Sequence, residues 1–193
     1  MDQLLRIFGQ NAGDVMLVGP SGVGKTTLFE GLAQLMASED VPVYLQDKRL
    51  VILDPGALIA GASGIGTLEQ RMQEIIHEMT KAGNIILGIE DVHHLLNMRS
   101  SGGSEDVAGI LMNAMSQGQI RVVATTTTEE YQQFIESHAP FMRRFQVVRV
   151  DELSQDDAIK VLEAKTALLE NQHKVFFSYA AVSSIVDFSV RFI

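Results

Sequence analysis

Cysteine is absent from this chain of 193 residues. Without thiols the protein has no disulfide framework and no metal site built on cysteine. Basic residues are also few, since 15 Lys and Arg stand against 24 Asp and Glu, and the formal net charge is −9. A broad surface for DNA or RNA requires a basic patch, so this balance argues against a nucleic-acid partner.

Long apolar runs are missing as well. No stretch of the sequence reaches the roughly 18 apolar residues that cross a bilayer. The opening segment, MDQLLRIFGQ, has neither the basic region nor the long apolar core of a signal peptide. We therefore expect no membrane partner and a cytoplasmic location. Apolar residues still make up 46% of the chain, which is enough for a sizeable core.

Short apolar runs alternate with segments of helical periodicity as far as residue 151. The runs predict strands at 14–18, 49–53, 84–89, 121–126 and 146–150, with those at 14–18 and 84–89 buried in a parallel sheet. Between them, apolar residues three and four positions apart predict helices at 25–37, 68–79 and 107–115. This alternation is typical of an α/β domain, so we expect a five-stranded, mostly parallel sheet flanked by helices over residues 1–151.

Beyond Asp151 the pattern becomes helical only. Ser154 and Asp157 form a helix start of the capping-box kind, and apolar residues at 159, 162 and 169 continue on one face. The last helical segment ends on Phe192-Ile193 without a cap or a breaker, which indicates a fragment of a longer chain. We expect residues 152–193 to be the start of a helical subdomain.

The clearest motif is GPSGVGKT, Gly19–Thr26, which fits G-x-x-x-x-G-K-[ST] without a mismatch. A triphosphate needs several converging donors, and the glycines let backbone N–H groups approach it at the start of a helix. Lys25 is expected to reach the β- and γ-phosphates, and the Thr26 hydroxyl to hold Mg²⁺. The residues expected to bind ATP are Gly19, Pro20, Ser21, Gly22, Val23, Gly24, Lys25, Thr26 and Thr27.

Two carboxylates, Glu90 and Asp91, end the predicted strand NIILGI. Nucleotide hydrolysis needs one acid that holds Mg²⁺ through water and another that orients or deprotonates the attacking water. We expect Glu90 to take the first role and Asp91 the second. Taken without the loop, the pair also fits two solvated acids at a strand end.

Four longer segments resemble the first ATPase module of the Clp family of AAA+ proteins, which are ring-forming unfoldases and disaggregases. The segments are GPSGVGKTTLFEGLAQ, KRLVILDPGALIAGA, NIILGIEDVHHLL and VVATTTTEEYQQFIESHAPFMRRFQVVRVDELS. The resemblance extends over residues 10–193 and implies the P-loop AAA+ fold, with residues 152–193 as the start of its lid. It also implies a ring, six-membered in the family, a polypeptide substrate, and an adaptor or peptidase as a further partner.

The resemblance also implies roles for single residues. In the family, a polar residue that closes the fourth strand senses the γ-phosphate, and the matching residue is Thr127, with Thr126 as the neighbouring alternative. Arg143 and Arg144 match the arginine fingers that reach the γ-phosphate held by the next subunit. A positive charge there stabilises the transition state, so the resemblance places the complete active site between subunits.

Two positions depart from the family pattern. The family ends its acidic strand Asp-Glu, whereas this chain has Glu90-Asp91, and a displacement of about 1 Å costs on the order of a hundredfold in rate. In the central-pore loop the family carries an aromatic residue that grips the polypeptide, and Gly64 stands there, between Ser63 and Ile65. We expect binding of ATP to survive, hydrolysis to be weakened and the grip on substrate to be weak.

Three functions therefore stay open at this point. The first is an ATP-hydrolysing motor module, and the second is an ATP-binding module that holds a ring together with little or no hydrolysis. The third covers other P-loop ATPases, such as clamp-loader or DNA-remodelling relatives, against which the acidic charge counts.

Other features have plain structural readings. His93 and His94 follow the acidic strand, but no third ligand stands at metal spacing, so no metal site is expected there. The methionines sit largely at helical core positions. The segment RSSGGS, residues 99–104, predicts a mobile loop.

Overall fold

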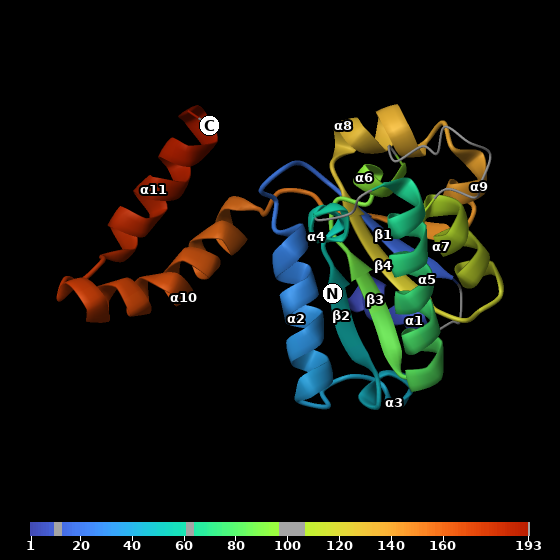
Figure 1. The fold of residues 1–193 in the computed structure, drawn as a ribbon. Helices are drawn as coiled ribbons and strands as arrows, with labels where there is room; N and C mark the ends of the chain where they lie inside the picture. The colour runs from blue at the N-terminus through green and yellow to red at the C-terminus, as the bar shows by residue number, and fades with distance from the viewer. Residues whose placement is uncertain (10–12, 61–63, 97–106, 193) are drawn as a thin grey trace. The chain divides into compact units, whose positions relative to one another are not determined.

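The computed structural model describes residues 1–9, 13–60, 64–96 and 107–192, and the chain divides into two compact units, Met1–Val150 and Asp151–Ile193 (Figure 1). In the first unit five strands form one sheet in the order β2-β3-β4-β1-β5. Their bounds are β1 Asp14–Val18, β2 Arg49–Leu53, β3 Ile85–Ile89, β4 Arg121–Thr126 and β5 Phe145–Arg149. Each neighbouring pair is parallel, which confirms the predicted α/β fold.

The central strand β1 shows why these runs become buried strands. Every residue of β1 is buried, because helices cover both faces of a parallel sheet. Its side chains alternate between the two faces, so Val15 and Leu17 enter one hydrophobic cluster and Met16 and Val18 enter the other. An unbroken apolar run is therefore the sequence pattern that this position requires.

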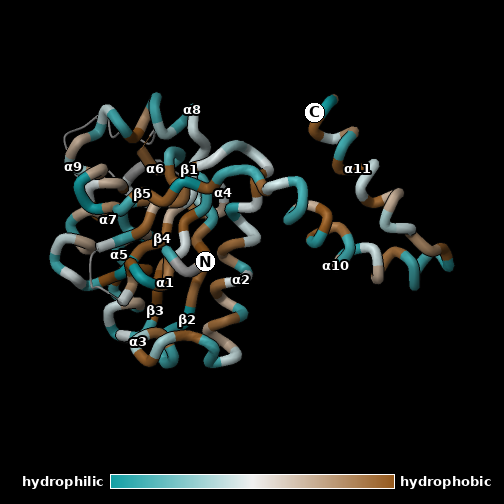
Figure 2. The backbone as a smooth tube through the Cα atoms, turned by 180° about the vertical axis from the view of Figure 1, so that it is seen from behind, coloured by the Kyte–Doolittle hydropathy of each residue, from teal (hydrophilic) through white to brown (hydrophobic). Residues whose placement is uncertain are grey.

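Helices pack on both faces of the sheet, but the edge strand β2 stays largely exposed. On one face, α1 (Asp2–Gly9) and α2 (Lys25–Ala37) contribute Phe8 and Phe29 to the core. On the other face, α5 (Ile65–Ala82) and α7 (Val107–Ser116) contribute Met72 and Leu111. Figure 2 shows that the strands between these layers are predominantly apolar, as the double burial demands.

Several short elements connect the longer ones, and the sequence pattern did not predict most of them. They are α3 (Val43–Gln46), α4 (Pro55–Ile59), α6 (His93–Leu96), α8 (Thr128–Glu130), the π-helical turn η1 (Tyr131–Ile135) and α9 (Ala139–Met142). Each is too short to show a helical period. Local chemistry starts α4, where the Asp54 side chain accepts the Gly56 N–H at 2.8 Å and Pro55 occupies the first turn.

The second unit is a pair of helices, α10 (Gln155–His173) and α11 (Tyr179–Phe192). Ser154 caps α10 as predicted, since its hydroxyl accepts the Asp157 N–H at 3.2 Å and donates to the Asp157 carboxylate at 2.8 Å. Within this unit α10 buries no residue, and α11 buries only Val182 and Val186. Across the described residues, no helix combines the length and apolar character needed to cross a bilayer.

Candidate nucleotide-binding site

A hollow of about 490 Å³ lies where the carboxyl ends of β1, β3 and β4 meet. The pairing of Val18 with Thr126 and of Ile89 with Ala124 brings the segments that follow these strands to the same edge of the sheet. The residues that line it are Ser21, Gly22, Gly24, Lys25, Thr26, Thr27, Glu90, Asp91, His93, His94, Thr125, Thr127 and Glu130. Parallel sheets commonly bind ligands at this edge.

The loop after β1 is held close against the end of β5. A Cβ atom added to Gly19 would lie 2.2 Å from the carbonyl oxygen of Val150, so the position accepts only glycine. Gly24 adopts a left-handed backbone, with φ of 101°, and directly precedes α2. The loop therefore turns into the helix N-terminus as the motif predicts, and the resulting N–H groups and dipole favour phosphate.

Lys25 is the charged residue of the loop, and its side chain is buried. Its ammonium group donates to the carbonyl oxygens of Gly19 at 2.8 Å and Pro20 at 2.7 Å. Backbone carbonyl groups of the loop thus hold the Lys25 ammonium group in place. A triphosphate that enters the hollow offers charged oxygens in exchange for these neutral acceptors, and hydrogen bonds between charged groups are roughly twice as strong.

The two acids differ in their surroundings. Glu90 is half-buried, and its Oε1 has no hydrogen-bond partner among the described residues. Asp91 is exposed and has a left-handed backbone, with φ of 46°, while its N–H donates to the Thr125 hydroxyl at 3.1 Å. Aspartate tolerates this conformation better than most residues do. Glu90, with its unpartnered carboxylate oxygen, and the exposed Thr26 line the same hollow, and oxygen ligands of this kind fit a hard cation such as Mg²⁺.

Thr127 lies at the hollow, whereas Thr126 is fully buried. The Thr127 hydroxyl caps α8 by accepting the Glu130 N–H at 3.2 Å, and it donates to the Glu130 Oε2 at 3.0 Å. Thr126 instead turns its hydroxyl toward Nδ1 of His93, at 3.4 Å. Of the two threonines, only Thr127 contacts the space in which a nucleotide fits.

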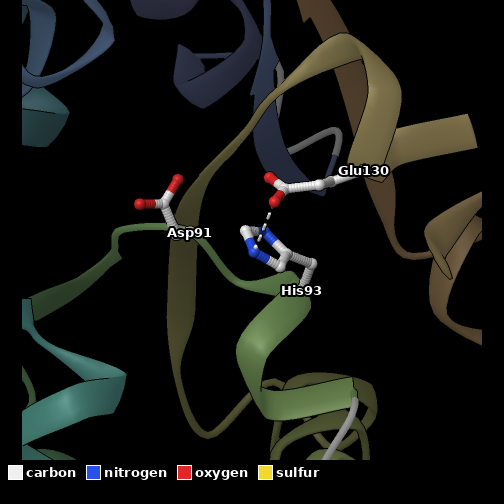
Figure 3. Close-up of side chains that lie close together, drawn as sticks. All are labelled: Asp91, His93 and Glu130. Atoms are coloured by element: carbon white, nitrogen blue, oxygen red, sulfur yellow. Dashed lines mark ion pairs between the residues drawn. The ribbon is translucent and has the colours of Figure 1, made fainter. Parts of the chain in front are cut away.

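His93 and Glu130 contact each other at the wall of the hollow, with Nε2 and Oε1 3.1 Å apart, and the contact is an ion pair when His93 is protonated (Figure 3). Burial lowers the pKa of His93, an effect that the Glu130 charge opposes. Neither residue was predicted to belong to the site. The spacing Thr127-x-x-Glu130 is that of a capping box, so this signal was present in the sequence for Glu130.

The remaining predicted residues lie elsewhere. Arg143 and Arg144 are exposed at the end of α9 and do not line the hollow. Gly64 precedes α5 with an extended backbone, and a Cβ added there would meet no atom within 4 Å. Ser63 and the loop at 99–104 lie outside the described residues, as does the side chain of Ile65.

Together, the parallel sheet, the glycine-rich loop at the start of α2 and the acids at the end of β3 define a P-loop nucleoside-triphosphate-binding domain. Comparison with known proteins narrows this class. The family described as ATPase family associated with various cellular activities (AAA) matches residues 15–152. The chain belongs to this family, and nucleotide binding follows from that membership.

Within the family, the relatives confirm the resemblance to Clp proteins. Chaperone protein ClpB of Helicobacter hepaticus is 40% identical over 178 residues, which are 92% of this chain and 21% of ClpB. The chloroplastic chaperone protein ClpD1 of Oryza sativa is 40% identical over 182 residues, 92% of this chain and 19% of ClpD1. A structure of S. cerevisiae Hsp104 with casein superposes with a TM-score of 0.86 at 31% identity, covering 99% of this chain and 33% of that one. The chain thus spans about a fifth of the length of these curated relatives.

Proposed function

We propose that the chain is an ATP-hydrolysing AAA+ module of a Clp-type protein unfoldase or disaggregase. The observation that carries the proposal is the convergence of the loop, Lys25, the two acids and Thr127 on one hollow. Hydrolysis requires groups that bind the phosphates and groups that activate a water, placed around the same hollow. Nucleotide binding alone requires only the phosphate-binding groups.

The proposed mechanism uses the groups of the hollow in order. Backbone N–H groups of the loop and the Lys25 ammonium bind the phosphates, with Lys25 leaving the carbonyls of Gly19 and Pro20. Thr26 and Glu90 are the residues that would hold Mg²⁺, which when bound would supply charge neutralisation at the phosphates. Asp91 orients a water and accepts its proton, and Thr127 donates to the γ-phosphate once its hydroxyl leaves Glu130.

Arg143 and Arg144 complete the proposal through assembly. Both are exposed and stand apart from the hollow of their own chain, which fits a role at the site of a neighbouring subunit. We propose a ring, six-membered as in the family, that acts on polypeptides and works with an adaptor or peptidase. The Hsp104 structure with casein supports a polypeptide substrate. Residues 152–193 are proposed as the start of the lid, and a cytoplasmic location stays a prediction.

One observation favours a second function, namely an ATP-binding module that stabilises a ring with little hydrolysis. The acids occur in the order Glu90-Asp91, so the carboxylate proposed to activate water is one methylene shorter than in the family pattern. Gly64 also offers no side chain with which to hold a polypeptide. Both features weaken catalysis and grip, and neither affects the phosphate-binding loop.

The two functions are separated by measuring ATP binding and steady-state ATP hydrolysis on the same purified protein. A hydrolysing module shows turnover that Lys25→Ala abolishes together with binding and that Asp91→Asn abolishes while binding persists. Tight binding without turnover establishes the assembly module. Equal turnover in the parent and in Asp91→Asn contradicts the role of Asp91, and absence of binding contradicts both functions.

A further inference from the structure

Three potential metal ligands meet at the wall of the hollow. One ligand atom from each of Asp91, His93 and Glu130 lies within 4.8 Å of the other two. Asp91 follows β3, His93 begins α6 and Glu130 ends α8, and His93 and Glu130 are 37 positions apart along the chain. Figure 3 shows the imidazole and the Glu130 carboxylate facing each other, with the Asp91 carboxylate beside them. The fold therefore brings Glu130 to His93 as a further potential ligand, which the spacing of residues in the sequence does not show.

The His93 ring is oriented as a metal ligand. It is 3% exposed, and its Nδ1 lies 3.4 Å from the hydroxyl of the fully buried Thr126. When the imidazole proton lies on Nδ1 and is donated to that oxygen, Nε2 carries the lone pair and can bind a metal ion held between it and the Glu130 carboxylate. Metal-binding histidines are usually fixed in this way through the ring nitrogen that does not bind the metal.

The spacing of the ligand atoms also fits. Two ligands at about 2.05 Å from a tetrahedral Zn²⁺ lie about 3.3 Å from each other. Nε2 of His93 and Oε1 of Glu130 are already 3.1 Å apart, so these two need almost no movement. Asp91 is exposed, which leaves its side chain free to turn the short remaining distance. All three residues line the hollow, which leaves room for a water as the fourth ligand.

We propose that Asp91, His93 and Glu130 bind a divalent transition-metal ion, Zn²⁺ in preference to Mg²⁺, at a site separate from the Mg²⁺ of the nucleotide. The preference follows from the ligands, because imidazole suits Zn²⁺ while Mg²⁺ selects oxygen and retains its waters. Two carboxylates balance the charge of the ion. The nucleotide's Mg²⁺ is assigned to Thr26 and Glu90, and neither residue belongs to this set.

Binding of Zn²⁺ has a consequence that rests on the proposed function. Asp91 cannot coordinate the ion and accept a proton from water at the same time, so an occupied site stops hydrolysis while ATP stays bound. The metal site would then act as an inhibitory site that shares Asp91 with the proposed catalytic residues. Metal binding itself does not depend on hydrolysis, so the two proposals can fail separately.

The test measures Zn²⁺ binding by competition with a chromophoric chelator, without nucleotide and with excess Mg²⁺. The parent protein is expected to bind one Zn²⁺ and to unfold at a higher temperature when it is bound. His93→Gln and Glu130→Gln are each expected to weaken binding by about tenfold or more. His94→Gln and Glu129→Gln, which change the neighbouring residue of the same type, are the matched controls and should keep the parent affinity.

Several results overturn the proposal. They are no Zn²⁺ binding by the parent, no rise in its unfolding temperature, or equal binding by parent, His93→Gln and Glu130→Gln. Since His93 is buried, thermal unfolding of each variant shows whether it folds, and the half-buried Glu130 gives a second variant of lower risk. In an ATPase assay Zn²⁺ is expected to inhibit the parent and His94→Gln but not Glu130→Gln. Binding of Zn²⁺ by a protein with no turnover supports the metal site and contradicts only the proposed hydrolysis.

Discussion

The Thr127 hydroxyl donates a hydrogen bond to the Glu130 carboxylate at 3.0 Å, so the group proposed to contact the γ-phosphate has its proton committed within its own helix turn. A phosphate oxygen must compete with this carboxylate. The exchange replaces one charged acceptor with another, and its net free energy is therefore small. Thr127 then acts on the rate of hydrolysis more than on the affinity for ATP.

Replacing Thr127 with Ala is expected to lower kcat by about 10- to 100-fold and to change the Kd for ATP by less than about threefold, because loss of a single donor to the transition state costs on the order of 2–3 kcal/mol. Thr127→Ser keeps the hydroxyl and should retain most of the activity. Thr127→Ala also loses the cap of α8, at about 1 kcal/mol. An equal loss in Thr127→Ser would show that the methyl group, not the hydroxyl, matters.

Asp91 combines a catalytic proposal with an unusual backbone. Asp91→Asn keeps the left-handed conformation accessible and removes the charge, so turnover should fall by about a hundredfold or more at unchanged stability. Asp91→Glu keeps the charge but places a longer residue at φ of 46°, and we expect it to be less stable by about 1 kcal/mol. Thermal unfolding and ATPase assays on both variants separate charge from strain. An unaltered unfolding temperature in Asp91→Glu would show that the left-handed backbone at position 91 does not disfavour the longer side chain.

Gly19 tests the fit between the loop and β5. Gly19→Ala brings a methyl group within 2.2 Å of the Val150 carbonyl oxygen, so the loop must shift and ATP affinity should fall by at least about tenfold. Gly66→Ala is the matched control, because a Cβ there meets no atom within 4 Å. Isothermal titration with ATP gives both affinities. Equal affinities in the two variants would show that the contact is not needed.

Asp14 predicts a pH dependence of stability. Burial raises its pKa from 3.8 to about 6, against the opposing effects of the Val122 N–H, Arg121 and Arg144. The folded state therefore binds this proton more tightly than the unfolded state does. The stabilisation is present below about pH 4 and is lost as pH rises through 6, in an amount on the order of 3 kcal/mol. Above that range Asp14 is ionised in both the folded and the unfolded state and adds no further pH dependence to the free energy of unfolding.

Asp14→Asn should lack this component. The difference in unfolding free energy between variant and parent is therefore expected to shift in favour of the variant between pH 4 and pH 6.5, measured by urea unfolding at each pH. Other titrating groups cancel in the difference. A difference that stays constant across this range would contradict the raised pKa.

Arg143 is expected to act only in an assembly. Arg143→Ala should lower turnover by at least about tenfold at unchanged ATP affinity, since the arginine reaches a neighbouring subunit's γ-phosphate. Mixing Arg143→Ala with Lys25→Ala subunits should restore part of the activity, because some interfaces then carry one intact Lys25 and one intact Arg143. Arg49→Ala, an exposed arginine at the start of β2, is the control. Failure of the mixture to regain activity would place the arginine's role within its own chain.

Sequence patterns predicted the parts of the fold that are set by local chemistry. The five strands were placed to within one residue at each end, because each carries a short apolar run, and in β1 the run over 15–18 is buried on both faces of the sheet. The loop and the start of α2 at Lys25 follow from glycine and helix-start rules that act within a few residues.

What escaped prediction depends on contacts between distant segments. The pairing of His93 with Glu130 and the burial of Asp14 against Val122 both arise from strand order, which no local pattern specifies. The left-handed backbone at Asp91 depends on how β3 leaves the sheet beside Thr125. Arg143 and Arg144 stay a prediction, because the γ-phosphate that they are expected to reach is held by a neighbouring subunit.

The close approach of Gly19 to Val150 also connects the phosphate-binding loop to the end of the first unit. The Val150 N–H donates to the Val18 carbonyl oxygen at 2.8 Å, and the next residue, Asp151, begins the second unit. The peptide that leaves the ATP-binding unit is thus fastened to the two residues that introduce the phosphate loop. Any displacement of this loop on phosphate binding would therefore act directly on the residue that precedes the second unit.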